Sequence, residues 1–335
     1  MLVKDKISKI NLNLFVLFFQ HLVKFILEMR LFIKNYFSPV LRLKFLCLLF
    51  VGITGVSNCQ ILDNKRGDAF TTKPFFNQQF IKNNKIKKLS ANVSFKKQGS
   101  AIKQTNLLYS FSFDEFGRLS HFLESNYRGK KIDTVEYFYH YNSEGLLDFE
   151  RKKEMNGYTS IHYGYNEIGE MVLKEFRRDV LDEKDSVIKS TVLYLKKIEN
   201  VIFKNRKREI IYNNYGLPYK EIEYTFSEDG YLLEQREKMK MSSAFFKKTF
   251  SYNEQGWVSS KKNFRSNDSI PSERWEYKYD AWGNLIKLDY YRGDSLLEQK
   301  EIYYSEKTNL IGNMLIINNK TQNLKIIRFK NIDFY

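Results

Sequence analysis

The chain contains little cysteine, proline, histidine or tryptophan: among its 335 residues are 2 Cys, 4 Pro, 4 His and 3 Trp. So few cysteines exclude a disulfide-stapled scaffold, and with only four histidines they also exclude a Cys-rich zinc module. Phenylalanine and tyrosine are abundant, at 28 and 23 residues, and hydrophobic residues make up 43% of the chain. This composition excludes a disordered chain and is sufficient for a sizeable core.

Acidic residues are in deficit, at 39 Asp+Glu against 55 Lys+Arg. The densest basic clusters are Lys82, Lys85, Lys87 and Lys88, then Lys96 and Lys97, then Lys204, Arg206, Lys207 and Arg208. Such patches suit anionic lipid head groups, glycans or nucleic acid, but lysine mixed with glutamate is also typical of solvated strand faces. We favour the solvated-face interpretation, keep an anionic surface as an alternative partner, and expect no specific nucleic acid.

Residues 1–59 resemble a secretory signal peptide. An apolar run at 45–56 follows Arg42 and Lys44, and the small residues Ser57 and Cys59 precede Gln60. A basic flank, a dozen or so apolar residues and small residues before the cut are the features of such a signal. We therefore expect an N-terminal helical signal segment, cleavage between Cys59 and Gln60, and no transmembrane domain in the mature chain.

Two alternatives to soluble export remain open. Cleavage before Cys59 would leave its thiol for lipidation, although Asn58 is a poor residue for the preceding position. An uncleaved anchor is the other. The initiator is either Met1 or Met29, because a signal peptide normally begins close to its charged region. In each case the protein is exported, to the periplasm, the outer surface or the medium.

The main signal is an internal repeat of the form aromatic–Asn/Asp/Ser–x–x–Gly–x–aliphatic. Its clearest copy is Tyr279-Asp280-Ala281-Trp282-Gly283-Asn284-Leu285. Asp, Asn or Ser accepts a backbone hydrogen bond two residues on, and Gly takes the left-handed conformation of a type I turn with a G1 bulge. The structural turn glycines are Gly117, Gly145, Gly169, Gly216, Gly230, Gly256 and Gly283.

Aromatic residues alternate before each turn, as at Tyr277 and Tyr279, which predicts strands with one buried face. The glycines recur about every 26 residues, enough for two strands and two turns. Gly216 falls off this period, so we assign it to the other end of the sheet, with a degenerate turn at 196–200. A last copy carries Thr308 in place of glycine and should form a different or frayed turn.

The Tyr-x-Tyr-Asp-x-x-Gly-x-Leu form, at 277–285, resembles the YD repeats of the RHS/teneurin family. The resemblance covers roughly residues 105–310 and implies a twisted or spiralling antiparallel β-sheet. The repeats here are too few for the cargo-holding shell of that family, and no toxin module is recognisable. A weaker likeness to aromatic–Gly cell-wall-binding repeats rests on Gly256-Trp257 and Gly230-Tyr231.

Aromatic residues inside the turns are the candidates for a ligand platform, because core burial is least assured there: Tyr215, Tyr231, Trp257 and Trp282. The alternating aromatic stripe is instead expected to form the core. His140 and His162 share the opposite face, without a third ligand in pattern. No nucleophile elbow, P-loop or HExxH motif occurs, so we expect no catalytic residue, no metal and no cofactor.

The sequence thus predicts an all-β protein in three parts: an extension with signal peptide at 1–59, a lead-in with the first strand or strands at 60–104, and a hairpin-repeat domain at 105–335. The fold class is an antiparallel meander whose exposed face must be covered by curling or by a partner. The expected function is a non-catalytic envelope or secreted scaffold that binds an unknown protein or glycan. The alternatives are a component related to RHS-type toxin delivery and an aromatic-repeat glycan-binding module.

Overall fold

The computed structural model describes residues 60–335 apart from 155–156, 184–185, 267 and 307. The chain divides into two compact units, 1–57 and 58–335. The expected signal segment, its cleavage site and the lipidation alternative at Cys59 therefore concern residues that lie outside the described part, except for Gln60.

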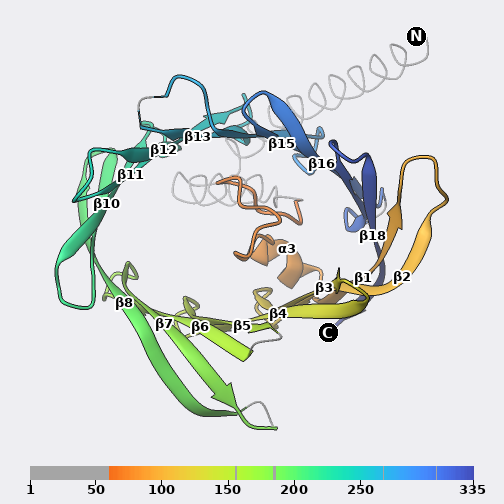
Figure 1. Cartoon of the computed structure of the whole chain (residues 1–335), viewed down its shortest axis with the longest axis horizontal. Helices are drawn as coiled ribbons and strands as arrows, with labels where there is room; N and C mark the ends of the chain where they lie inside the picture. Colours follow the sequence, from red (N-terminus) through yellow and green to blue (C-terminus); the bar gives the residue numbers. More distant parts are fainter. Residues whose placement is uncertain (1–59, 155–156, 184–185, 267, 307) are drawn as a thin grey trace, which may run out of the picture. The chain divides into compact units, whose positions relative to one another are not determined.

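Eighteen antiparallel strands follow one another around a single sheet (Figure 1). They are β1(Ile86–Lys96), β2(Lys103–Phe113), β3(Leu119–Arg128), β4(Lys131–Tyr141), β5(Leu147–Glu154), β6(Gly157–Tyr165), β7(Met171–Leu181), β8(Val187–Phe203), β9(Arg206–Tyr212), β10(Pro218–Phe226), β11(Leu232–Met239), β12(Phe245–Tyr252), β13(Val258–Arg265), β14(Glu273–Tyr279), β15(Leu285–Arg292), β16(Ser295–Tyr304), β17(Ile311–Asn318) and β18(Asn323–Phe334). The expectation of an all-β antiparallel meander in sequence order is confirmed.

The sheet closes on itself, so the expectation of an open twisted or spiralling sheet is wrong. β1 pairs with β18, for example Val93 with Ile327, as well as with β2. Strand twist accumulates around a long meander until its two edges meet, and closure removes both edges. The result is a β-barrel whose aromatic stripe faces inward. Closure is thus the form of curling that covers the otherwise exposed face of the sheet.

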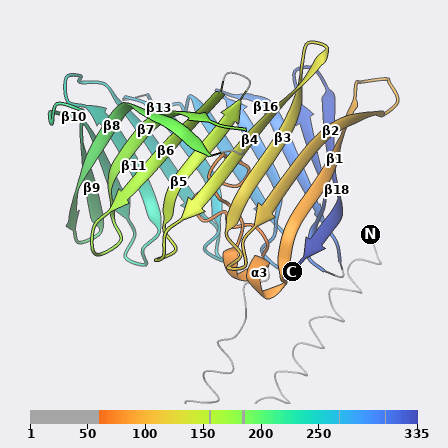
Figure 2. The same cartoon turned by 90° about the horizontal axis from the view of Figure 1, so that it is seen from below.

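Residues 60–85, here called the inner segment, lie inside the barrel and carry α3(Gln78–Asn83), the only helix among the described residues (Figures 1 and 2). The Asn77 side chain caps this helix by accepting a hydrogen bond from the Phe80 amide. Ile61 and Ile81 are fully buried, and Phe76 packs edge-on against Phe111 of β2. The inner segment thus supplies part of the core.

The two ends of the barrel differ in their turns. The motif end is the end formed by the turns that contain Gly117, Gly145, Gly169, Gly230, Gly256 and Gly283, and the opposite end includes the turn at Gly216. At all seven glycines φ is positive, between 73° and 82° in most cases and 85° at Gly283. In the motif-end turn at Asp280, one carboxylate oxygen accepts the amides of Trp282 and Asn284, each at 2.9 Å.

Two turn expectations are wrong. No turn interrupts 196–200, because β8 continues to Phe203 and the motif-end turn lies at Lys204, with φ of 49°. In the last copy the left-handed residue is Asn309, with φ of 54°, rather than Thr308. The Ser305 amide bonds to the Leu310 carbonyl, one residue further than in the glycine copies, so this turn is one residue longer.

A tyrosine precedes five of the motif-end turns and ties its repeat to the previous one. The hydroxyl of Tyr279 donates to the carbonyl of Val258 at 2.9 Å. Val258 is the first residue after the preceding glycine turn. The same bond recurs from Tyr141, Tyr165, Tyr252 and Tyr304 to the carbonyls of Leu119, Leu147, Leu232 and Leu285. This contact gives the tyrosine of the repeat a structural role that alternation alone does not reveal.

Candidate functional site

The four turn aromatics proposed as a ligand platform do not lie together. Trp282 is 72% exposed at the motif end, whereas Tyr215 is 88% exposed at the opposite end. Tyr231 and Trp257 lie at the motif end but pack against the barrel, with ring centroids 4.8 Å from Tyr252 and 5.3 Å from Tyr279 respectively. No single surface brings all four to one ligand.

Tyr231 and Trp257 have a packing role. Each follows a turn glycine, and each ring covers the glycine of the next repeat. A Cβ at Gly256 would lie 2.3 Å from the Tyr231 hydroxyl oxygen, and one at Gly283 would lie 2.4 Å from Cζ2 of Trp257. These two aromatics therefore close contacts between successive turns, and only Trp282 and Tyr215 present free faces.

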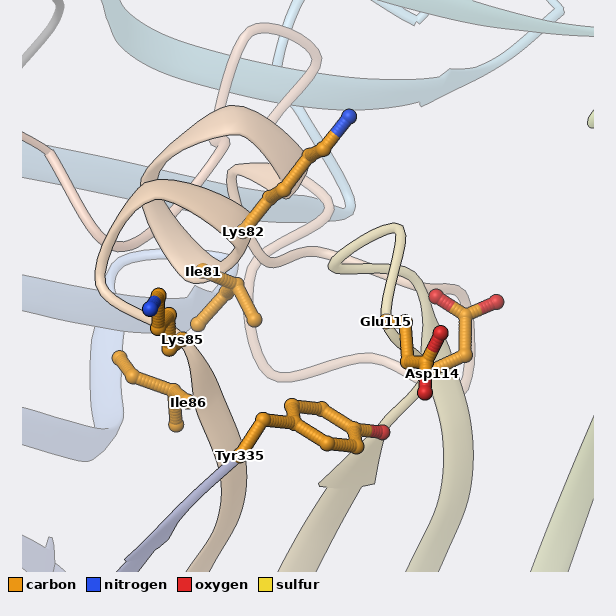
Figure 3. A pocket seen from close by; sticks show the side chains of 7 residues that line it. All are labelled: Ile81, Lys82, Lys85, Ile86, Asp114, Glu115 and Tyr335. Carbon is orange, nitrogen blue, oxygen red and sulfur yellow. The ribbon is translucent and has the colours of Figure 1, made fainter.

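One hollow at the motif end has a volume of about 270 Å³ and lies between α3, the β2–β3 turn and the last residue (Figure 3). Lys82, Lys85, Asp114 and Glu115 line it with charges of both signs. The Tyr335 hydroxyl donates to the Phe113 carbonyl at 2.6 Å, and Asp114 is held by Arg118 at 2.7 Å. Because these groups already engage one another, the hollow is largely an internal junction.

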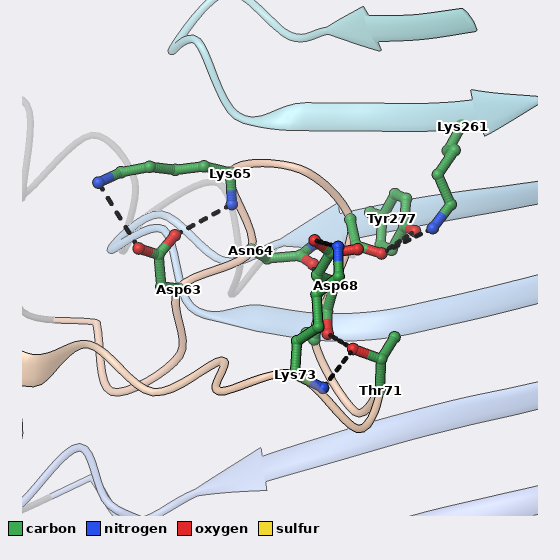
Figure 4. Close-up of polar contacts among 10 residues, drawn as sticks. Asp63, Asn64, Lys65, Asp68, Thr71, Lys73, Lys261 and Tyr277 are labelled. Atoms are coloured by element: carbon green, nitrogen blue, oxygen red, sulfur yellow. Dashed lines mark hydrogen bonds and ion pairs between the residues drawn. The ribbon is translucent and has the colours of Figure 1, made fainter. Parts of the chain in front are cut away.

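The inner segment is fixed to the wall by hydrogen bonds to its backbone (Figure 4). The Gly67 carbonyl accepts from the Tyr277 hydroxyl at 3.1 Å and from Lys261 Nζ at 2.9 Å. From the other side of the barrel, the Tyr139 hydroxyl donates to the Thr72 carbonyl at 2.5 Å. Burial raises the pKa of Tyr277 and Tyr139, so both hydroxyls stay protonated donors.

A larger hollow, of about 630 Å³, lies at the opposite end of the barrel, where β11 to β15 end. Most of its lining side chains belong to the inward face of these strands. They are Glu237, Phe246, Lys248, Asn263, Arg265, Glu273 and Arg292, joined by Lys247, Phe264, Asp268 and Ser272. We call this hollow the rim pocket.

Two of the rim pocket's carboxylates are already occupied. Glu273 accepts a hydrogen bond from Asn263 Nδ2 at 2.9 Å and another from the Tyr290 hydroxyl at 2.8 Å. Glu237 forms an ion pair with Lys220. The third acidic group, Asp268, is exposed in the connecting loop. The negative charge of the pocket wall is thus mostly engaged within the barrel.

Unlike the carboxylates, three cations of the rim pocket have no ion-pair partner among the described residues. Among the described residues, no carboxylate lies within ion-pair distance of Lys248, Arg265 or Arg292. Arg292 bonds instead to the Tyr290 hydroxyl at 3.5 Å, and this bond raises the pKa of its guanidinium further above the ordinary range. Phe246 is 54% exposed beside them. The arrangement offers positive charge and an aromatic ring to an anionic group.

The sequence reasoning did not single out this pocket. The available signal was alternation: Lys248 lies two residues before Phe250, and Glu273 lies two residues before Trp275, so both belong to the inward stripe. Their convergence could not be read from one repeat, because the pocket combines five strands and closure of the barrel brings the inward faces together.

The three histidines of the described residues lie on the outer wall. His121 contacts Glu136 at 3.0 Å and His140 contacts Asp148 at 3.1 Å, and each ring stacks on a phenylalanine. Burial lowers the pKa of His162. In the described part of the chain, no group of three His, Cys, Asp or Glu residues is arranged as metal ligands are.

A search for long apolar helices in the described residues finds none that could span a membrane. No protein-family model matches the sequence, and no curated protein matches it.

Several solved structures show a weak likeness. A porin-like protein from Bacteroides uniformis aligns with a TM-score of 0.38 and 9% identity, over 74% of this chain and 98% of that one. A porin-like protein from Bacteroides vulgatus gives 0.28 and 12%, over 71% and 96%. The Photorhabdus luminescens Tc holotoxin pore gives 0.23 and 10%, over 66% and 19%. Scores this low do not show a shared fold and carry no functional argument.

Proposed function

We propose that the protein is a non-catalytic exported scaffold of the cell envelope or the medium, and that its rim pocket binds an anionic group of an envelope glycan. The observation that carries the proposal is the set of cations, Lys248, Arg265 and Arg292, beside carboxylates that are engaged elsewhere. An arginine guanidinium binds a carboxylate or phosphate through two parallel hydrogen bonds. A sugar ring can stack on an exposed aromatic face such as Phe246.

The charge of the outer wall supports an aqueous setting for the barrel. Outward side chains pair across neighbouring strands, as when Arg208 contacts Glu221 at 2.9 Å and Glu223 at 3.2 Å. Within β15, Lys287 pairs with the buried Asp289 at 3.2 Å. Lysine or arginine on a lipid-facing barrel wall costs about 2–4 kcal/mol at the bilayer midplane. We therefore place the mature barrel in the periplasm, at the outer surface or in the medium, without a transmembrane domain.

Resemblance to YD repeats stays part of the proposal at the level of the hairpin unit. The recurring turn, with its tyrosine tie to the previous repeat, supports a repeat built by duplication of one hairpin. A cargo-holding role is less well supported, because the inner segment already occupies part of the interior. For this reason we favour the scaffold over a component of toxin delivery.

Titration with an acidic polysaccharide tests the pocket. Full-length protein should bind polygalacturonate in isothermal titration calorimetry at low salt, and neutral dextran should give no heat. Arg265→Gln with Arg292→Gln should weaken binding at least tenfold. The matched control, Arg206→Gln, removes an exposed arginine from the motif end of the outer wall and should leave affinity unchanged. Equal weakening by the control would indicate a general charge effect and contradict the pocket.

Export has its own test. N-terminal sequencing of the protein recovered from envelope and medium fractions should give Gln60 as the first residue. An intact N-terminus, or a lipid-modified Cys59, would contradict soluble export without touching the proposal for the rim pocket.

A further inference from the structure

The hairpin formed by β7 and β8 extends beyond its neighbours at the opposite end (Figure 1). β8 is 17 residues long, but it pairs with β9 only from Lys197 to Phe203. Before Lys197 the strand pairs with β7 alone, apart from one hydrogen bond that the Leu195 amide donates to Asn214 Oδ1. Within the described residues, the second edge of β8 between Val187 and Tyr194 has no strand partner.

This free edge is apolar. Ile188 is 68% exposed, Val192 47% and Leu193 54%. Strand edges left open in soluble proteins are usually protected by charged residues or proline, because they present unpaired amides and carbonyls. The edge of β8 between Val187 and Tyr194 holds one charge, Lys189, and no proline.

A second open edge in the same barrel shows the usual protection. β2 pairs with β3 only from Tyr109 onward, which leaves its first part open. The side chains there are polar from Lys103 to Asn106, three of these four being exposed, and are followed by the buried Leu107 and by Leu108, which is 50% exposed. The contrast indicates that the β8 edge, unlike the β2 edge, is suited to a partner strand.

We propose that the β8 edge pairs antiparallel with the same edge of a second copy of this chain, with Ser190 at the two-fold axis. In such a pair, directly opposed residues lie on the same face of the sheet. The two-fold axis therefore lies between two copies of the same residue. Ile188 then faces Val192 of the second copy, and Lys189 faces Thr191. Against β7 both Ile188 and Leu193 are bulged, so regular pairing of β8 with β7 extends from Lys189 to Val192.

The neighbouring registers are worse matched. Centring on Lys189 places two ammonium groups opposite each other and sets Ile188 against Ser190. Centring on Thr191 sets Ser190 against Val192. Of these three registers, only the one centred on Ser190 opposes apolar side chains with apolar ones on the outward face, where cross-strand contacts stabilise a pair and like charges destabilise it. Ser190 is also small, and its hydroxyl is turned to Asp179 at 2.7 Å, so it leaves the axis clear.

Sedimentation of the full chain tests the dimer. Wild-type protein should be dimeric at about 0.1 mM, a concentration at which a micromolar complex is saturated. The variant with Ile188→Lys and Val192→Lys should be monomeric, because the substitutions oppose lysines across the axis. The control, with Ile168→Lys and Ile270→Lys, changes two loop isoleucines that are 77% and 66% exposed and should remain dimeric. Circular dichroism should show an unchanged barrel in both.

A cysteine pair then tests the register. In a background with Cys47→Ser and Cys59→Ser, Ser190→Cys should cross-link two copies on mild oxidation, since directly opposed Cβ atoms lie about 4.5–5.5 Å apart. Thr191→Cys should cross-link at least tenfold more slowly, because it is displaced from its counterpart along the strand. Monomeric wild-type protein, a dimer that survives the β8 lysines, or faster cross-linking at position 191 would overturn the proposal.

Discussion

At the motif end three of the turn glycines, Gly117, Gly256 and Gly283, are enclosed, whereas at the opposite end the turn glycines are open. A Cβ on Gly117 would lie 2.2 Å from the Gln78 carbonyl, and Gly256 and Gly283 are covered by aromatic rings. At the opposite end, a Cβ on Gly129, Gly216 or Gly293 would meet no atom within 4 Å. The same residue type thus serves two needs: space and backbone conformation at these three positions, and conformation alone at the open ones, which include Gly230 of the motif end.

This difference extends to function. The motif end is packed by the inner segment and by contacts between successive repeats, so its residues are engaged with one another. In the described residues, the opposite end carries the rim pocket, where Lys248, Arg265 and Arg292 have no ion-pair partner, and the edge of β8 that has no strand partner. We infer that the motif end maintains the barrel and that the opposite end is available for binding.

The largest expected effect separates the two kinds of glycine. Gly117→Ala should cost about 3–4 kcal/mol, because its methyl group would press on the backbone of α3 in addition to the strain at φ of 82°. Gly216→Ala introduces only the backbone strain of a positive φ and should lower the free energy of unfolding by about 1 kcal/mol. Urea denaturation of both variants measures this, and equal losses would refute the distinction between the two ends.

We expect most residues at the opposite end to tolerate substitution. Asp179, at the base of the β7–β8 hairpin, is an exception. Its carboxylate accepts from Ser190 at 2.7 Å and from Arg151 at 3.0 Å, and it is 1% exposed. Asp179→Ala should cost about 3 kcal/mol, because it leaves the positive charge of Arg151 without its carboxylate partner. The same denaturation experiment measures the loss.

The pH dependence of the stability of this variant tests whether the charge of Asp179 contributes to it. Burial raises the pKa of Asp179, but hydrogen bonds from Ser190 and Arg151 outweigh it, and the net pKa is lowered. A lowered folded pKa contributes stability above the unfolded value, near 4, that is lost as the pH falls through the folded pKa. The stability gap between wild type and Asp179→Ala should therefore narrow below about pH 4. A gap that is constant from pH 7 to pH 3 would show that the charge of Asp179 contributes nothing.

The two motif-end tryptophans provide a smaller contrast. Trp257→Ala should cost about 2 kcal/mol, because the ring packs on Tyr279 and covers Gly283. Trp282→Ala should cost less than about 0.5 kcal/mol, since that ring is 72% exposed. Thermal unfolding of the pair is the measurement, and a larger loss for Trp282 would place it in the core.

The smallest effect concerns the tyrosine tie between repeats. Tyr252→Phe removes the hydroxyl that donates to the Leu232 carbonyl at 2.9 Å and should cost about 1 kcal/mol. Tyr303→Phe removes an exposed hydroxyl bound to Glu301 on the outer wall and should be nearly neutral. If the two variants lose the same stability, the tie contributes nothing beyond an ordinary surface bond.

Sequence alone determined the elements that depend on near neighbours. Asp280 and Gly283 define a turn through bonds that span four residues, and the stripe of Tyr277 and Tyr279 defines an inward strand face. The same local rules missed the turn around Asn309, where one inserted residue moves the left-handed position along the chain. They also placed a turn within 196–200, which β8 crosses without interruption.

The tertiary structure decided what depends on distant residues. Closure through Val93 and Ile327 requires the accumulated twist and stagger of every strand between them, and no repeat contains that information. The burial of Trp257 and the convergence of Arg265 with Arg292 follow only after closure, because each involves side chains from separate strands. Local hydrogen bonds and alternation made the hairpins predictable, whereas long-range pairing set which of their side chains became core and which remained available for a ligand.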